Sequence, residues 1–149
     1  MSALATVRLA IRVTVDPQEA FRVFTEEIDA WYRRGPHSFL HSKRAIGIRV
    51  EPGVGGRLVE VHDAETGEGV EMGRIRVWEP GRRLLFVERR GSEVDIRFDP
   101  ADGGTRVVLE HRGLERLAPR VADAVGRYGS RALLEWFRDY LDHRARQGV

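Results

Sequence analysis

Cysteine is absent from this sequence of 149 residues, which excludes disulfide bonds, thiolate catalysis and cysteine-ligated metal sites. No uninterrupted apolar run approaches the roughly 18 residues that a membrane-spanning helix needs. The N-terminus also lacks a basic segment followed by an apolar one, because Arg8 and Arg12 interrupt its apolar residues. We therefore expect a cytoplasmic protein without a membrane span.

Lysine is nearly absent as well, since Lys43 is the only lysine among 25 basic residues. The many arginines raise the sequence pI to about 9.5, although the formal net charge is only +2. The longest basic runs are pairs such as Arg89-Arg90, which follows Glu88, and no aromatic residues alternate with them. This pattern favours a solvated surface over a nucleic-acid-binding one.

The most informative stretch that the sequence does contain is the segment 119–146. Apolar residues recur there at steps of three and four, which is typical of an amphipathic helix. At 1.5 Å per residue this helix would be roughly 40 Å long, so its apolar face needs a large surface to cover. The predicted apolar stripe consists of Val121, Val125, Tyr128, Ala132, Trp136 and Tyr140, widened by Leu133, Phe137 and Leu141.

The chain before this helix consists mostly of predicted strands. Residues 6–15 alternate between apolar and polar, and Asp16-Pro17 then begins a short helix, followed by a second one that ends before Gly35-Pro36. Further strands separated by turn residues are expected at 45–50, 57–62, 70–78, 83–89, 94–98 and 105–111. The sequence therefore predicts a single α+β domain over residues 1–149. An antiparallel sheet of about six to seven strands would curl around the C-terminal helix.

A curved sheet wrapped around one helix tends to leave an apolar cavity between the two layers. Gly126, Gly129 and Ala132 are small residues near the middle of the helix and favour such a cavity. The alternative is a core that large side chains fill.

Five segments in order resemble the branch of the START and polyketide-cyclase superfamily that contains the homologues of the activator of heat-shock-protein ATPase. The resemblance spans nearly the whole chain. It rests on Asp16 to Phe24 with Trp31, Glu51-Pro52-Gly53-Val54-Gly55-Gly56-Arg57 with Glu60, Gly73, Val77-Trp78-Glu79-Pro80, and Gly104 to His111.

The resemblance implies the helix-grip fold, with two short helices after the first strand and a cavity beneath the last helix. It implies function less closely, because the superfamily includes lipid carriers, hormone receptors, polyketide cyclases and co-chaperone domains. The co-chaperone role belongs to longer proteins with an additional N-terminal domain, which we do not find in this sequence. No catalytic motif common to the branch can be carried over.

Two titratable residues are candidates for acid–base catalysis. Glu60, if it turns inward, would be a carboxylate in an apolar cavity; alternatively it is solvated or pairs with Arg57 or Arg74. His111 shares the strand face of Thr105, Val107 and Leu109 and could relay protons. A histidine at such a position is also often a hydrogen-bonded core residue.

Aromatic and other apolar residues are the candidates for ligand contacts, and core packing explains them equally well. His37 and His41 are four residues apart but lie in a predicted loop, so we expect no metal site. We also expect no cofactor. The predicted ligand-binding residues are Trp31, Tyr32, Phe39, Met72, Phe86, Tyr128, Ala132 and Trp136.

Three hypotheses for the function follow. The first is a protein that binds a hydrophobic small molecule, such as a lipid or an aromatic polyketide-like compound, in the cavity. The second is a cyclase- or hydrolase-type enzyme that uses Glu60 and His111. The third is a protein-interaction module with a chaperone as partner. An edge strand would also allow homodimerisation.

Overall fold

The computed structural model describes residues 6–33 and 43–147, and seven strands in this part of the chain form one antiparallel sheet. The strands lie in the order β1-β7-β6-β5-β4-β3-β2, so every strand after β1 pairs with its successor, and β7 returns to pair with β1. This confirms the predicted helix-grip arrangement. The strands are β1 (Thr6–Val13), β2 (Gly47–Val50), β3 (Arg57–Val61), β4 (Gly69–Glu79), β5 (Arg83–Glu88), β6 (Glu93–Ala101) and β7 (Gly104–Arg112).

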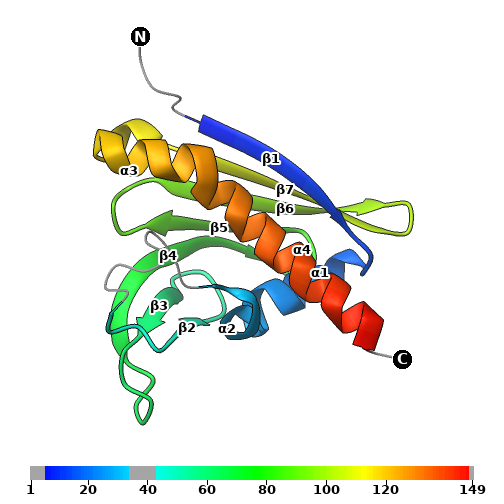
Figure 1. The fold of residues 1–149 in the computed structure, drawn as a ribbon, viewed down its shortest axis with the longest axis horizontal. Helices are drawn as coiled ribbons and strands as arrows, with labels where there is room; N and C mark the ends of the chain where they lie inside the picture. The colour runs from blue at the N-terminus through cyan, green and yellow to red at the C-terminus, as the bar shows by residue number, and fades with distance from the viewer. Residues whose placement is uncertain (1–5, 34–42, 148–149) are drawn as a thin grey trace.

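Two short helices follow β1, as the sequence predicts. Asp16 caps α1 because its Oδ1 accepts a hydrogen bond from the backbone N–H of Glu19 at 2.8 Å, and Pro17 occupies the first helical position. These helices close one end of the curved sheet, while the C-terminal helix crosses its concave side (Figure 1). The helices are α1 (Pro17–Glu26), α2 (Ile28–Trp31), η1 (Leu114–Arg116), α3 (Pro119–Ala124), η2 (Val125–Gly129) and α4 (Ser130–Gln147).

The C-terminal helix differs from the predicted one in that it is not α-helical throughout. The chain is helical from α3 to α4, but η2 is a π-helical turn, which holds more residues per turn than an α-helix. Most of the predicted stripe still faces the core, since Phe137 and Leu141 are buried and Leu133, Trp136 and Tyr140 pack against the core. Tyr128, predicted to be in the stripe, is 70% exposed. The side chains of α4 that are buried are Ser130, Leu134, Phe137 and Leu141.

Aromatic side chains fill the core where the middle of α4 meets α1 and α2. The ring of Phe24 lies 5.1 Å from that of Phe137 and 4.8 Å from that of Trp31, centroid to centroid. Phe98 of β6 packs edge-on against Phe24 at 5.9 Å. The indole N–H of Trp31 donates to the carbonyl oxygens at the end of α1, so its polar atom is satisfied inside the core.

The outer face of the sheet carries paired charges, in agreement with a solvated arginine-rich surface. Asp95 accepts two hydrogen bonds from Arg83, at 3.0 and 2.9 Å, and a third from Arg112 at 3.0 Å. These two arginines cover the Asp95 side chain, of which only 4% is exposed. None of the helices in the described ranges is long and apolar enough to cross a membrane.

The aromatic core gives a direct stability test. Phe137 is fully buried, so Phe137→Ala should lower the free energy of unfolding by about 3–5 kcal/mol in urea denaturation. Val54→Ala is the control, because Val54 is 72% exposed and its change should stay within about 0.5 kcal/mol. Equal effects of the two substitutions would contradict this description of the core.

Candidate functional site

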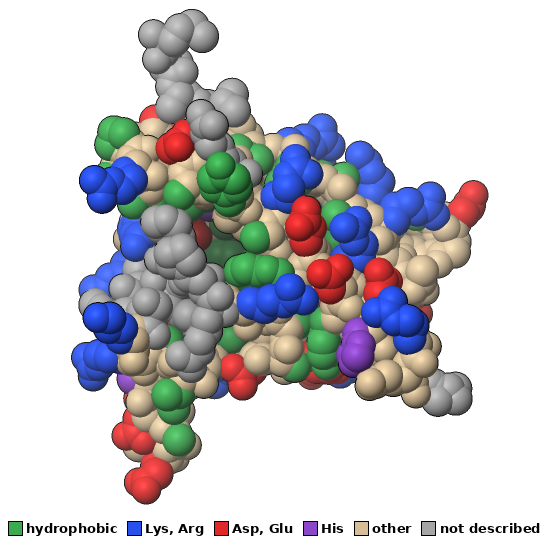
Figure 2. Space-filling view, viewed as in Figure 1, with side chains coloured by type: hydrophobic (Ala, Val, Ile, Leu, Met, Phe, Trp, Pro, Cys, Tyr) green, Lys and Arg blue, Asp and Glu red, His purple; other side chains and the backbone are tan. Residues whose placement is uncertain are grey.

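A cavity of about 250 Å³ lies between the concave face of the sheet and the N-terminal half of α4. Most of its wall is apolar. Figure 2 shows hydrophobic side chains around a hollow in this face of the molecule. The apolar wall includes Phe24, Ile28, Val50, Leu58, Met72, Ile75, Leu84, Phe86, Val94, Leu109, Val125, Leu133 and Trp136.

The cavity lies at this end of α4 because the helix presents small side chains here. Gly129 and Ala132 border the cavity, whereas Phe137, one to two turns further on, fills the space between helix and sheet. Gly126 is not part of the cavity wall, since a Cβ added there would meet Val7 and Leu114 at 3.7 and 3.8 Å. The size of the helix side chains thus determines where the interior is hollow.

Four polar residues form a connected cluster at one end of the cavity. His111 Nε2 lies 2.9 Å from Ser92 Oγ and 3.3 Å from Glu88 Oε2, and His111 Nδ1 lies 3.1 Å from Ser130 Oγ. Ser92 Oγ also donates to Glu88 Oε2. When Nε2 carries a proton it donates to this end of the cluster, and the Ser130 hydroxyl can accept from Nδ1 or donate to it, so every contact has a donor and an acceptor.

The local structure of three elements brings this cluster together. Leu84, Phe86 and Glu88 alternate along β5 and all border the cavity, so they share the concave face. The tight turn from Glu88 to Ser92 places these two residues opposite each other, with Gly91 at a φ of 102° that favours glycine. On β7, His111 pairs with Val94 of β6.

The carboxyl group of Glu88 is ionised more readily than usual. Burial alone would raise its pKa, but the hydrogen bond and charge of His111 outweigh burial, with help from Ser92 and the charge of Arg90, so the pKa of Glu88 lies below its ordinary value. About a third of the side chain is still accessible. Because Glu88 borders the cavity, an ionised carboxylate is exposed to the cavity interior.

Tyr32 forms another polar part of the cavity wall. Its pKa is raised by burial first and then by the negative charges of Glu88 and Glu60. The phenol therefore keeps its proton. Its ring also packs edge-on against Trp136 of α4, at 5.5 Å between centroids.

The structure places most of the predicted site residues around this cavity. His111 belongs to the polar cluster, while Trp31 lies in the aromatic core and is absent from the cavity wall. Phe39 falls outside the described residues, as do His37 and His41. The predicted ligand-binding residues that border the cavity are Tyr32, Met72, Phe86, Tyr128, Ala132 and Trp136.

Glu60 is fully buried, as an inward-facing carboxylate should be, but it is not among the residues that border the cavity. Its Oε2 lies 2.6 Å from Nε2 of His62, which shares its strand face. The two predicted acid–base residues thus belong to different polar pairs. Arg57 and Arg74, considered as partners of Glu60, bind Glu51 and Glu71 instead.

Sequence reasoning missed Glu88, Ser92 and Ser130. The alternation of Leu84, Phe86 and Glu88 was a usable signal, but Glu88 also begins a charged run with Arg89 and Arg90 and was interpreted as surface. Ser130 lies four residues before Leu134 and seven before Phe137 on the buried face of α4, but as a polar residue it was left out of the predicted apolar stripe. The described residues contain no group of three or more His, Asp or Glu side chains that could hold a metal ion.

Residues 14–141 match the model of the family described as activator of Hsp90 ATPase homolog 1-like protein. The chain belongs to this family. No curated protein matches the sequence. Family membership and fold fit a ligand-binding domain and identify no ligand.

Solved structures with the same fold include several members of similar length. A protein of Nitrosomonas europaea is 16% identical with a TM-score of 0.67, covering 97% of this chain and 98% of its own. An AHSA1-like protein of Aeromonas hydrophila is 22% identical with a TM-score of 0.66, covering 94% of both chains. An anthrahydroquino-γ-pyrone synthase, solved as a complex, is 29% identical with a TM-score of 0.61, covering 91% of this chain and 96% of its own.

The lowered pKa of Glu88 predicts a contribution to stability that depends on pH. In the unfolded chain Glu88 takes up a proton near pH 4.5, while in the folded protein it stays ionised to lower pH. Its contribution is therefore complete above pH 4.5 and is lost as the pH falls through the folded-state pKa. Glu88→Gln should reduce the fall in the free energy of unfolding that wild type shows from about pH 5 to about pH 3.

Urea denaturation at a series of pH values measures this difference. Part of the acid-dependent loss of unfolding free energy will persist in Glu88→Gln, because hydrogen bonds from Arg22 and Arg57 lower the pKa values of Glu19 and Glu51 to about 2. Glu65→Gln, at an exposed position in the β3–β4 turn, is the control and should follow the wild-type curve. A Glu88→Gln curve parallel to wild type would contradict the assignment.

Proposed function

We propose that this protein binds a small apolar or aromatic molecule in the cavity between α4 and the sheet. The observation that carries the proposal is a cavity of about 250 Å³ whose wall is apolar except for a few convergent polar groups. This combination is what small-molecule sites have in common. The volume suits a ligand of two or three fused rings better than a long-chain lipid.

The similarity to an anthrahydroquino-γ-pyrone synthase supports an aromatic, polyketide-like ligand. The aromatic rings of Tyr32, Phe86 and Trp136 in the cavity wall offer the edges and faces on which a planar ligand packs. Binding of a lipid, homodimerisation, a chaperone partner and a cytoplasmic location stay predictions.

The second candidate is an enzyme of the cyclase or hydrolase type. His111 borders the cavity and is held by hydrogen bonds at both ring nitrogens, which favours its role as an acid–base residue. Its carboxylate partner in the structure is Glu88 rather than Glu60. A reaction would therefore take place at the polar end of the cavity.

The binding proposal predicts that filling the cavity abolishes binding. The fluorescence of 1-aminoanthracene, a neutral three-ring probe, should rise saturably with wild-type protein. Ala132→Trp should weaken this binding at least about tenfold, equivalent to about 1.4 kcal/mol, because the indole occupies the space of the probe.

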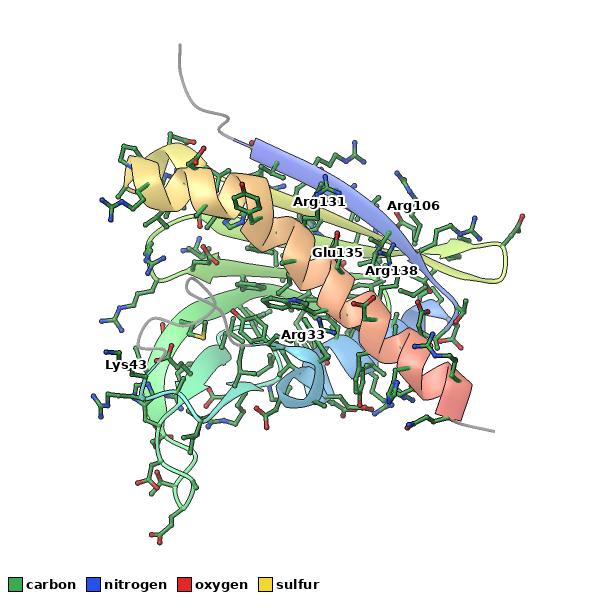
Figure 3. All side chains as sticks on the ribbon, in the orientation of Figure 1. Arg33, Lys43, Arg106, Arg131, Glu135 and Arg138 are labelled. Carbon is green, nitrogen blue, oxygen red and sulfur yellow. The ribbon has the colours of Figure 1, made fainter. Side chains whose placement is uncertain are left out.

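Arg131→Trp is the matched control, because it adds the same side chain at the neighbouring position. Arg131 is exposed and points to the β1 side of α4, away from α2 (Figure 3). Its variant should bind the probe as wild type does. The proposal fails if wild type shows no saturable binding, or if both variants bind equally well.

A further inference from the structure

Glu88 is an unusual group to find in the wall of an apolar cavity. In the described part of the chain its hydrogen-bond partners, Ser92 and His111, both contact Oε2. The contacts leave Oε1 as a hydrogen-bond acceptor on a residue that borders the cavity. A carboxylate oxygen in an apolar space needs a donor, since burial without one is costly.

The charges around the cavity decide which donor fits best. Arg89 and Arg90 also border the cavity and are exposed, so they stand at its mouth. Two arginines at the mouth disfavour a cationic ligand, while Glu88 inside disfavours an anionic one. A neutral hydroxyl group on an apolar body satisfies both conditions.

We propose that Glu88 is the specificity-determining residue of the cavity and accepts a hydrogen bond from a phenolic or enolic hydroxyl group of the ligand. This inference rests on the proposed binding function and narrows its ligand class to neutral, ring-containing molecules that carry a hydroxyl donor. The apolar wall binds the rings, and Oε1 of Glu88 binds the hydroxyl.

His111 acts on the ligand through Glu88 as a positioning residue. Its Nε2 lies 3.3 Å from Oε2, and Ser130 of α4 holds the opposite side of the ring at Nδ1. Ser92 donates to the same oxygen of Glu88. These contacts fix the carboxylate in one orientation and keep it ionised against the effect of burial.

Three probes with the same ring system test the inference. 2-Naphthol carries a hydroxyl donor, naphthalene is smaller and has none, and 2-methoxynaphthalene is larger and has none. Wild type should bind 2-naphthol about tenfold more tightly than either of the others, because a hydrogen bond to a charged acceptor is among the stronger ones. Fluorescence titration at neutral pH gives the three dissociation constants.

Glu88→Gln should reduce this preference to about threefold or less while naphthalene binds as before, because the neutral amide is the weaker acceptor. Glu88→Leu removes the acceptor altogether and should abolish the preference. Glu65→Gln, which removes the same charge in the exposed β3–β4 turn, should keep the wild-type preference. Thermal denaturation of each variant shows whether it is folded.

The role of His111 is tested by the pH at which the preference for 2-naphthol disappears. The titratable and charged groups that face Glu88 are His111 from β7, Arg90 from the β5–β6 turn and Tyr32 from the end of α2. The negative charge of Glu60 in turn raises the pKa of Tyr32. As the pH falls, protonation of Glu88 abolishes the preference. His111→Phe removes the donor that favours the ionised carboxylate, so Glu88 should take up its proton, and the preference should disappear, at a higher pH than in wild type. His111→Gln supplies an amide donor and should move the midpoint back toward that of wild type.

The outcomes separate this inference from the proposed function. If none of the three probes binds to wild type, the proposed function itself fails. If naphthalene binds and 2-naphthol binds no more tightly, the cavity is a binding site but Glu88 does not select for a hydroxyl group. Equal pH midpoints in wild type and His111→Phe would overturn the positioning role alone.

Discussion

The packing of one helix against the concave face of a seven-stranded sheet is the constraint on which the rest of this structure depends. The sheet offers more apolar surface than α4 alone can cover, so α1 and α2 close one end with Phe24 and Trp31. At that end Phe137 completes a solid aromatic core. At the other end Gly129 of η2 and Ala132 of α4 face the sheet, and the two layers enclose a space. One helix therefore provides both the stability of the domain and its cavity.

The polar cluster shows how the chain places titratable groups beside that cavity without leaving them unsatisfied. Glu88 and Ser92 face each other across a tight turn, His111 follows on the neighbouring strand, and Ser130 completes the set from α4. The four residues come from the β5–β6 turn, β7 and α4, so the complete cluster forms only in the folded protein. Ser130 lies on the buried face of α4 together with Leu134 and Phe137, directly after the π-helical turn η2. Such turns are frequent at functional sites, and here the turn directly precedes a residue of the cavity wall.

Much of the fold followed from local patterns, while the site depended on contacts that no local pattern contains. Alternating residues and turn residues predicted all seven strands to within a few residues of their ends. The helix was predicted as a single α-helix. Phe137 and Leu141 of its predicted stripe are buried, whereas Tyr128, within the π-helical turn, is exposed, and Ser130, outside the predicted stripe, is buried. Glu88 could have been placed on the concave face from its alternation with Leu84 and Phe86 in β5. Its contact with His111 could not have been predicted, because the two residues are distant in sequence. The contact between Glu60 and His62 could have been predicted from the sequence, because side chains two residues apart in an extended segment lie on the same side.

The location of the polar residues also bears on how one fold can serve many ligands. The apolar wall is made by strand interiors that the sheet needs for its own stability, so it can change little without loss of the fold. Glu88 and Ser92 flank a turn, His111 lies one residue before the end of β7, and Ser130 begins α4. Substitutions at the ends of elements disturb the sheet less than substitutions within it. Similar chains at 16–29% identity keep the fold over nearly their whole length, so function has to be argued from the residues at these ends rather than from the fold.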